Sequence, residues 1–109
     1  MPNMKLSRPI ESYIAAANAQ DVDAVTACFS EGAVVHDDKQ ERQGIAAIRR
    51  WAEEVSEKYH PTVEVLDIAE TDGSTVLTGR ISGNFPGSPI ELRYAFVLNR
   101  GKIERLEIS

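Results

Sequence analysis

The chain has 109 residues, of which 42% are hydrophobic and 27% are charged, and its formal net charge is −5. This length is enough for one domain with a core or a modest pocket, but not for a second domain. The acidic balance disfavours a nucleic-acid-binding protein, because neutralising several phosphates needs a basic surface.

Two helices are predicted in the first 32 residues. Ser7 can cap the first helix, and Pro9 is tolerated in its first turn. Asp21 can cap a second, shorter helix that ends at Gly32. The apolar positions at helical spacing are Ile10, Tyr13, Ile14 and Ala17 in the first helix, and Val22, Val25, Cys28 and Phe29 in the second. The short link between them favours two helices that fold back on each other.

A strand, a loop and a third helix are expected next. Residues 33–37 have the pattern of a short strand, and the polar run 38–43 has that of a loop. A helix is predicted from about Gly44 to Tyr59, and Pro61 cannot continue it. Its apolar stripe consists of Ile45, Ile48, Trp51, Ala52, Val55 and Tyr59.

From Thr62 onward the apolar residues alternate with period two, which is typical of strands. The Asp-Gly pair in residues 71–74 predicts a tight hairpin turn, and further strands are expected over 75–83 and 90–99. Residues 84–89 are rich in turn formers and connect these two strands.

Three helices followed by consecutive hairpins predict an α+β fold, in which helices cover one face of a meander sheet. A last tight turn at 99–102 leads into a final strand. The central strands are apolar on one face and mixed on the other. Burial of this second face against another subunit is therefore compatible with the sequence.

The N-terminal nine residues contain no apolar stretch long enough for a signal peptide, and no segment approaches the roughly 20 apolar residues of a membrane span. Cys28 is the only cysteine, so the chain cannot form an internal disulfide, and we expect a cytoplasmic location. Its place beside Phe29 on an apolar helix face indicates a buried thiol rather than a reactive one.

Three segments together resemble a known superfamily. They are YIAAANAQDVDAV, then AVVHDD followed by QGIAAIRRW, and finally FVLNRGKIERLEI. In this order they resemble ketosteroid isomerase and the SnoaL-type polyketide cyclases of the NTF2-like superfamily. The segment SGNFPGSPIELRYAFVLNRGKI is closer still to bacterial SnoaL-like proteins. The resemblance covers nearly the whole chain, so residues 1–109 are expected to form a single SnoaL-like domain.

The resemblance implies an NTF2-like cone. Three N-terminal helices would pack on a curved, mostly antiparallel sheet and enclose an apolar pocket. It also implies a homodimer that forms through the sheet. The superfamily carries many unrelated activities and many non-enzymes, so the fold alone does not give the function.

Asp37 and Tyr13 occupy the places at which ketosteroid isomerase carries a general base and an oxyanion donor. Asp37 would accept a proton from carbon or water. The Tyr13 phenol would donate a hydrogen bond to the enolate oxygen that develops in the transition state. Two alternatives stay open: Asp37 is a solvated acid at a strand end, and Tyr13 is a core tyrosine with an ordinary partner.

Tyr94 marks a departure from ketosteroid isomerase, in which a protonated Asp accompanies the Tyr donor. Aligning FVLN with the family's last hairpin places Tyr94 at the position of that Asp. A phenol is protonated near neutral pH and can donate the same bond. It is also larger, which disfavours steroid-sized substrates. The alternative is a strand tyrosine that packs beside Leu92 and Phe96.

The resemblance also implies a substrate-binding wall, made of Trp51, Val35, Phe29, Val55 and Phe96. Two distant histidines without paired cysteine or acidic ligands predict no metal site. No nucleotide-binding or nucleophile motif is present, so we expect no cofactor and no covalent catalysis. An epoxide-hydrolase-like reaction would need an Asp-Arg-Asp set, with Arg80 or Arg93 as its arginine.

The resulting hypothesis is a cofactor-free isomerase, cyclase or dehydratase that moves a proton on a small apolar or carbonyl-containing molecule. The alternatives are a binding protein of the same fold without turnover, and a dimerisation module whose cavity is filled by Trp51, Tyr94 and Phe96. No nucleic-acid or membrane partner is expected.

Overall fold

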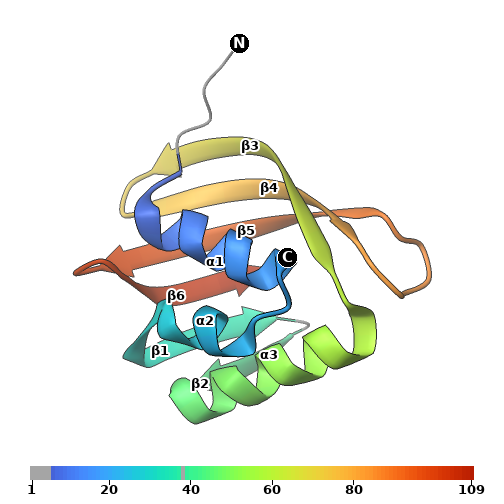
Figure 1. Ribbon diagram of the computed structural model, residues 1–109. Helices are drawn as coiled ribbons and strands as arrows, with labels where there is room; N and C mark the ends of the chain where they lie inside the picture. Colours follow the sequence, from blue (N-terminus) through green and yellow to red (C-terminus); the bar gives the residue numbers. More distant parts are fainter. Residues whose placement is uncertain (1–5, 38) are drawn as a thin grey trace.

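The computed structural model describes residues 6–37 and 39–109. Within these ranges, three helices and six strands follow one another in a mixed order (Figure 1). The elements are α1 (Arg8–Asn18), α2 (Val22–Ala27), β1 (Phe29–Asp37), β2 (Gln40–Gln43), α3 (Ile45–Tyr59), β3 (Thr62–Thr71), β4 (Ser74–Ser82), β5 (Ile90–Asn99) and β6 (Lys102–Ile108). The α+β prediction is confirmed, with three helices and one sheet.

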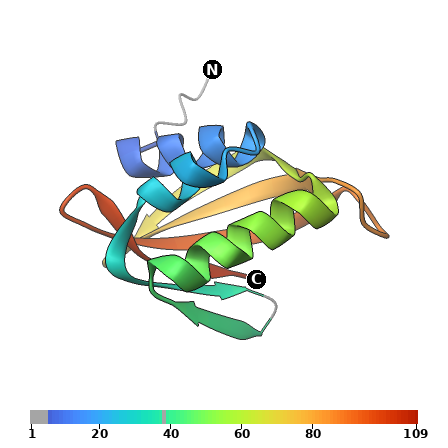
Figure 2. The same cartoon turned by 60° about the horizontal axis from the view of Figure 1, so that its bottom comes forward.

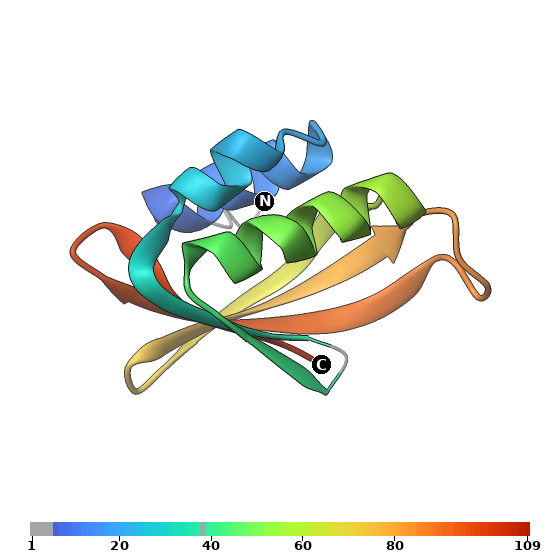
Figure 3. The ribbon, with the colours of Figure 1, turned by 90° about the horizontal axis from the view of Figure 1, so that it is seen from below.

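The six strands form one sheet in the order β2-β1-β6-β5-β4-β3. Only β1 and β6 pair in parallel, so the sheet is mostly antiparallel and its two edges stay open. All three helices lie on one face of the curved sheet, as Figures 2 and 3 show from two directions. The sheet therefore has a helix-covered inner face and an outer face.

Two of the predicted boundaries are wrong. The second helix ends at Ala27, and Phe29 already belongs to β1, because the Cys28 carbonyl accepts the backbone N–H of Ile103 at 2.8 Å and draws the chain into the sheet. Residues 40–43 form strand β2 rather than a loop, because they pair with β1 from Asp37 back to Val34. Their side chains are polar on both faces, so no alternation signals the strand.

The other elements follow the predictions closely. Asp21 caps α2, since its carboxylate accepts the backbone N–H of Ala24 at 3.1 Å. Ser7 occupies the N-cap position of α1, but its side chain makes no capping bond. Gly73 and Gly101 both have positive φ, which is the backbone conformation that the two tight turns require.

The core lies between the helices and the inner face of the sheet. Its fully buried large side chains are Phe96, Ile10, Ile48, Leu77, Ile103, Leu106 and Val35. A set of polar contacts joins the α1–α2 turn to the end of α3 and the start of β3. Asn18 exchanges two hydrogen bonds with the backbone of Val63, at 2.6 and 3.0 Å, and Gln20 bonds to Ser56 and to the Pro61 carbonyl. These contacts hold the helical layer on the sheet without closing the space beneath it.

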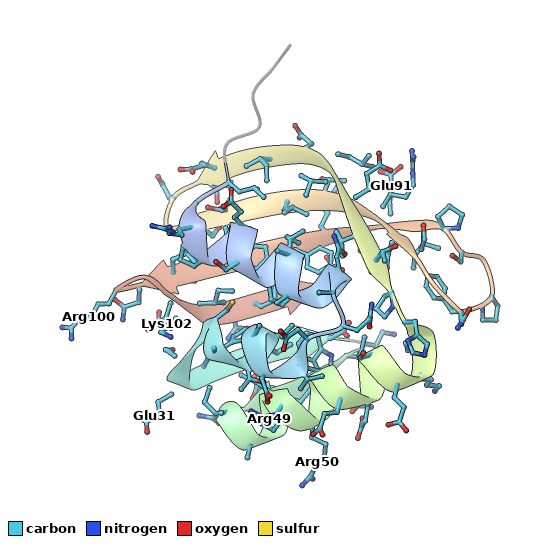
Figure 4. All side chains as sticks on the ribbon, viewed as in Figure 1. Glu31, Arg49, Arg50, Glu91, Arg100 and Lys102 are labelled. Atoms are coloured by element: carbon cyan, nitrogen blue, oxygen red, sulfur yellow. The ribbon has the colours of Figure 1, made fainter. Side chains whose placement is uncertain are left out.

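Within residues 6–37 and 39–109, no helix is both long and apolar enough to cross a membrane. On the exposed side of the helical layer, Arg49 of α3 pairs with Asp23 of α2 at 2.6 Å (Figure 4). Exposed pairs of this kind contribute little to stability, so the buried side chains hold the layers together.

Candidate functional site

An open cavity of about 920 Å³ lies between the helices and the inner face of the sheet. Helix α1 contributes Tyr13, helix α3 contributes Trp51 and Val55, and strand β5 contributes Tyr94 to its lining. Asp37 lies at the edge of this cavity, at the last position of β1. This volume falls within the range of roughly 300–1,000 Å³ that is usual for small-molecule sites.

The Asp37 carboxylate turns toward the cavity rather than away from the protein. Its Oδ2 accepts the indole N–H of Trp51 at 3.0 Å. Helix α3 brings Trp51 to this position because the backbone N–H of Gly44, just before the helix, bonds to the Ala33 carbonyl of β1 at 2.9 Å. Among the described residues none donates to Oδ1, which leaves this oxygen for a ligand.

Tyr13 and Tyr94 have buried rings, with 4% and 5% of their surfaces exposed. Neither hydroxyl bonds to a described residue, yet no buried side-chain oxygen in the described part of the chain lacks a partner. Both hydroxyl oxygens therefore keep some accessible surface, and since both residues line the cavity, we place these oxygens at its wall. Two unengaged phenol donors thus face the same space as the Asp37 carboxylate.

Burial changes the acidity of both phenols. Desolvation raises the pKa of Tyr13 well above its ordinary value, and the nearby Tyr94 and Asp37 raise it further. Desolvation also raises the pKa of Tyr94, with a second contribution from the charge of Asp37. Both side chains therefore stay protonated at neutral pH, so they are hydrogen-bond donors with one carboxylate near both of them.

An aromatic cluster fixes the two phenol rings. Tyr13 meets Phe29 and Phe96 edge-on, with ring centroids 5.9 and 5.7 Å apart, and Tyr94 stacks on Phe96 at 6.2 Å. Phe96 is fully buried and lies between the tyrosines. Rings packed on several sides have few alternative rotamers, so the hydroxyl positions are set by the core.

The residues expected in the substrate-binding wall fall into two groups. Trp51 and Val55 line the cavity. Val35, Phe29 and Phe96 lie behind its surface, with 0%, 3% and 0% of their areas exposed. This second group packs against the lining residues and positions them, and nothing in the geometry gives it direct access to a ligand. A substrate-binding role for the wall stays a prediction.

The sequence does not predict several polar residues of the lining, among them Gln20, Lys39, Arg42 and Glu107. Arg42 lies on β2, in the segment expected to be a loop, and its guanidinium donates to the Asp37 carbonyl at 3.0 Å. Pairing of β2 with β1 places Arg42 here, and a wholly polar segment gives no signal of that pairing. Arg80 and Arg93 are exposed and do not line the cavity, and Arg80 pairs with Glu64 at 3.3 Å.

His36 lines the same cavity as Asp37 and the phenols, whereas His60 does not. His36 is partly exposed, with its Nδ1 4.0 Å from a carboxylate oxygen of Glu107. His60 is exposed at the C-cap of α3. In the described ranges no three His, Cys, Asp or Glu side chains are grouped so that they could hold a metal ion.

The chain matches the SnoaL-like domain family over residues 10–106, which is most of its length. It belongs to the SnoaL-like domain family. No curated protein matches this SnoaL-like chain at a significant level.

Solved structures agree with this assignment. A protein from Sinorhizobium meliloti described as a candidate polyketide cyclase is 33% identical, with both chains covered completely and a TM-score of 0.93. The epoxide hydrolase/cyclase-like enzyme SalBIII, which has a role in pyran ring formation in polyether salinomycin, is 23% identical over 92% of this chain and 85% of its own, with a TM-score of 0.81.

A protein of ketosteroid isomerase-like fold from Catenulispora acidiphila, solved with trimethylamine, is 12% identical. The match covers 96% of this chain and 86% of that one, with a TM-score of 0.83. These two more distant structures show the fold alone. Together with the 33% identical structure, they confirm the NTF2-like fold that the sequence resemblance implies.

Proposed function

We propose that this SnoaL-like protein is a cofactor-free enzyme that moves a proton on a small carbonyl compound, as an isomerase, a cyclase or a dehydratase does. The observation that carries the proposal is the meeting of one carboxylate, Asp37, with two phenol donors, Tyr13 and Tyr94, at one cavity. The similarity to a candidate polyketide cyclase at 33% identity supports the same class.

The reaction needs three events at these groups. The Asp37 carboxylate removes a proton from the carbon next to the carbonyl, and the electrons of that C–H bond form an enolate. Tyr13 and Tyr94 donate hydrogen bonds to the enolate oxygen, which carries more charge than the ground-state carbonyl. Protonated Asp37 then returns the proton to another carbon or to a leaving oxygen. Proton and charge balance without an external group.

The Trp51 bond would orient the base during this cycle. Because the indole N–H can only donate, it holds Oδ2 in place and leaves Oδ1 facing the substrate. The open cavity also suits a second candidate, a protein that binds a ligand without turnover. In that case the contact between Trp51 and Asp37 has a structural role only.

The direct test is exchange of α-protons for deuterium in D₂O, followed by NMR on a panel of small cyclic ketones and enones. The wild-type protein should accelerate exchange on at least one member, and Asp37→Asn should lower the rate by about 10²- to 10⁴-fold. Tyr13→Phe should lower it while leaving the base in place. Acceleration that survives in Asp37→Asn contradicts the role of Asp37, and a panel with no acceleration favours the binding candidate.

A homodimer through the outer face of the sheet is a second part of the proposal. Leu77, Tyr94 and Phe96 are buried on the inner face of the sheet. Val76 pairs with Ala95, and Val97 pairs with Arg105, at the positions between them. Alternation along the strands turns Val76, Ala95 and Val97 outward, where they form a partly exposed apolar strip on a face without helices (Figure 3).

The single cysteine supports a cytoplasmic location for the protein.

A further inference from the structure

We propose that the cavity continues from Asp37 and the two phenols into an apolar arm, which binds an uncharged apolar tail of the same ligand. The arm is defined by Tyr59, Phe85, Pro86, Ile90 and Leu92, which all line the cavity. The inference names a substrate class for the function proposed above and rests on it: a carbonyl compound with a long apolar substituent, not a small polar one.

Strand β5 gives the arm its direction. Tyr94, Leu92 and Ile90 alternate onto the inner face of this strand. Their exposure rises along it, since Tyr94 is 5% exposed, Leu92 is partly buried and Ile90 is 39% exposed. The four steps along the strand from Tyr94 to Ile90 span about 13 Å at roughly 3.3 Å per residue. An apolar track therefore leads from the buried phenol to the open side of the cavity.

Strand β4 itself contributes no side chain at the middle of this track, because residue 79 is a glycine. Gly79 of β4 pairs with Leu92, between the pairs Leu77–Tyr94 and Ile81–Ile90. A Cβ at Gly79 would lie 3.0 Å from a methyl group of Val63, so even an alanine is tight at this point. The side chains of Val63, Leu77 and Ile81 occupy the space above Gly79, and Val63 and Ile81 line the cavity, so the floor beside Leu92 is apolar.

The β4–β5 connection, residues 83–89, forms the wall opposite the track. The Phe85 ring meets Tyr59 edge-on at 5.9 Å, and the Asn84 backbone N–H bonds to the Tyr59 carbonyl at 2.8 Å. The Ser88 hydroxyl accepts the Gly83 N–H at 3.0 Å. The connection is thus fixed to the end of α3, and it presents Phe85 and Pro86 to the cavity as a preformed wall.

Ile90 points to an occupant. It is the one large hydrophobic residue with an exposed surface in the described ranges, and it lies on the inner face of the sheet at the end of the arm. Covering such a side chain removes apolar area from water and is favourable. Because the arm and the phenols share one cavity, a single ligand with a polar head and an apolar tail satisfies both ends.

Lys58 borders the arm, but its Nζ lies 5.3 Å from the centroid of the Tyr59 ring. The ammonium group is thus placed to hold this ring by a cation–π contact. None of the five residues that define the arm is charged, which favours an uncharged tail.

The test uses 4-alkylphenols of increasing chain length as probes, with the phenol as an enolate mimic, and measures Kd by titration calorimetry on the full chain. In the wild type each added methylene should tighten binding by about fourfold until the chain passes Ile90. Ile90→Gln should weaken the longest phenol by about tenfold and leave phenol itself within about twofold.

Glu91→Gln is the matched control, because Glu91 is the next residue of β5 and faces outward (Figure 4). It should keep the wild-type dependence on chain length. A chain with a terminal carboxylate should bind more weakly than its methyl-ended counterpart, and tighter binding would overturn the uncharged tail.

The outcomes separate this inference from the proposed function. Equal Kd values along the series, with phenol itself bound, overturn the arm and leave the proton-transfer proposal standing. If affinity increases with chain length but the wild type exchanges no α-protons, the result supports the arm and contradicts the proposed enzyme. Absence of binding by every member, or the same loss in Glu91→Gln as in Ile90→Gln, overturns the arm.

Discussion

At the scale of residues, the chemistry of the site depends on how the core packs the rings of Tyr13 and Tyr94 and keeps their phenols neutral. Their rings are packed against Phe29 and Phe96, and their hydroxyls reach the cavity without a described protein partner. Burial and the charge of Asp37 both favour the neutral phenol. These two tyrosines are therefore hydrogen-bond donors without an acceptor among the described residues, and an oxygen of a ligand would accept their bonds.

The raised pKa of each phenol predicts a loss of stability in alkali. Below about pH 10 both the folded and the unfolded chain hold the phenol protons, so neither tyrosine changes stability with pH. Above that value the unfolded chain releases them first, and the free energy of unfolding should fall by about 1.4 kcal/mol per pH unit for each buried phenol. The fall continues until pH reaches the folded-state pKa.

Urea denaturation at a series of pH values measures this slope. Tyr13→Phe should reduce it, and the double variant with Tyr94→Phe should reduce it further, while at pH 8 each variant should stay close to wild type. A slope in the double variant equal to that of the wild type would show that the two phenols are not held neutral by the fold.

Asp37, Tyr13 and Tyr94 can be predicted from the sequence as candidate residues, because each lies in a segment with a recognisable position in the superfamily. The hydrogen bond between Trp51 and Asp37 cannot be predicted in this way. That bond depends on how far α3 is rotated above β1, which is fixed by the Gly44–Ala33 backbone contact and by core packing. Helical periodicity places Trp51 on the apolar side of α3, but it does not identify its partner.

At the scale of elements, the β4–β5 connection depends on one close approach. A Cβ built at Gly83 would lie 2.7 Å from the Tyr59 carbonyl oxygen and 3.0 Å from the Phe85 ring. The nearer atom is backbone at the end of a helix, so it cannot move aside at low cost. Gly83 thereby allows the connection to lie against α3.

Gly83→Ala should destabilise the protein by about 1–3 kcal/mol, because the added methyl forces the connection away from Tyr59. Gly32→Ala is the control, since a Cβ there meets nothing within 4 Å and the residue does not have a positive φ. This control should be neutral or stabilising by up to about 1 kcal/mol. Equal unfolding free energies for the two variants would contradict the close packing at Gly83.

The elements also show where sequence patterns carry information. The helix expected over 44–59 and the strands after Thr62 follow clear apolar periods, and the structure confirms them. Strand β2 has no apolar face and exists only because β1 offers it an edge. The predicted end of the second helix at Gly32 is too late, because Cys28 and Phe29 continue a helical pattern, whereas pairing with β6 draws Phe29 into the sheet.

At the scale of the whole molecule, the two faces of the sheet have different roles. The inner face carries the core and the cavity under the helices. The outer face carries the strip of Val76, Ala95 and Val97, and we propose that a second copy covers it. Apolar side chains on an uncovered sheet face favour association, because pairing removes them from water.

Sedimentation equilibrium should therefore give the mass of two chains for the wild type. Val97→Glu should shift the mass toward one chain, since two buried carboxylates would face each other or the strip. Ala69→Glu, at an exposed position of the edge strand β3, serves as the control and should keep the wild-type mass. A monomeric wild type would contradict the proposed dimer, and the account of the cavity would stand without it.

The central claim is that Asp37, Tyr13 and Tyr94 act on one ligand in one cavity. Trp51 is the only tryptophan and it contacts Asp37, so its fluorescence reports on this place. The measurement is a titration of a phenolate-type enolate mimic, followed by Trp51 fluorescence, in wild type, Asp37→Asn and Tyr13→Phe. We predict that the mimic quenches Trp51, binds more tightly to Asp37→Asn because a like charge is gone, and binds more weakly to Tyr13→Phe. Unchanged affinity in both variants would contradict the claim.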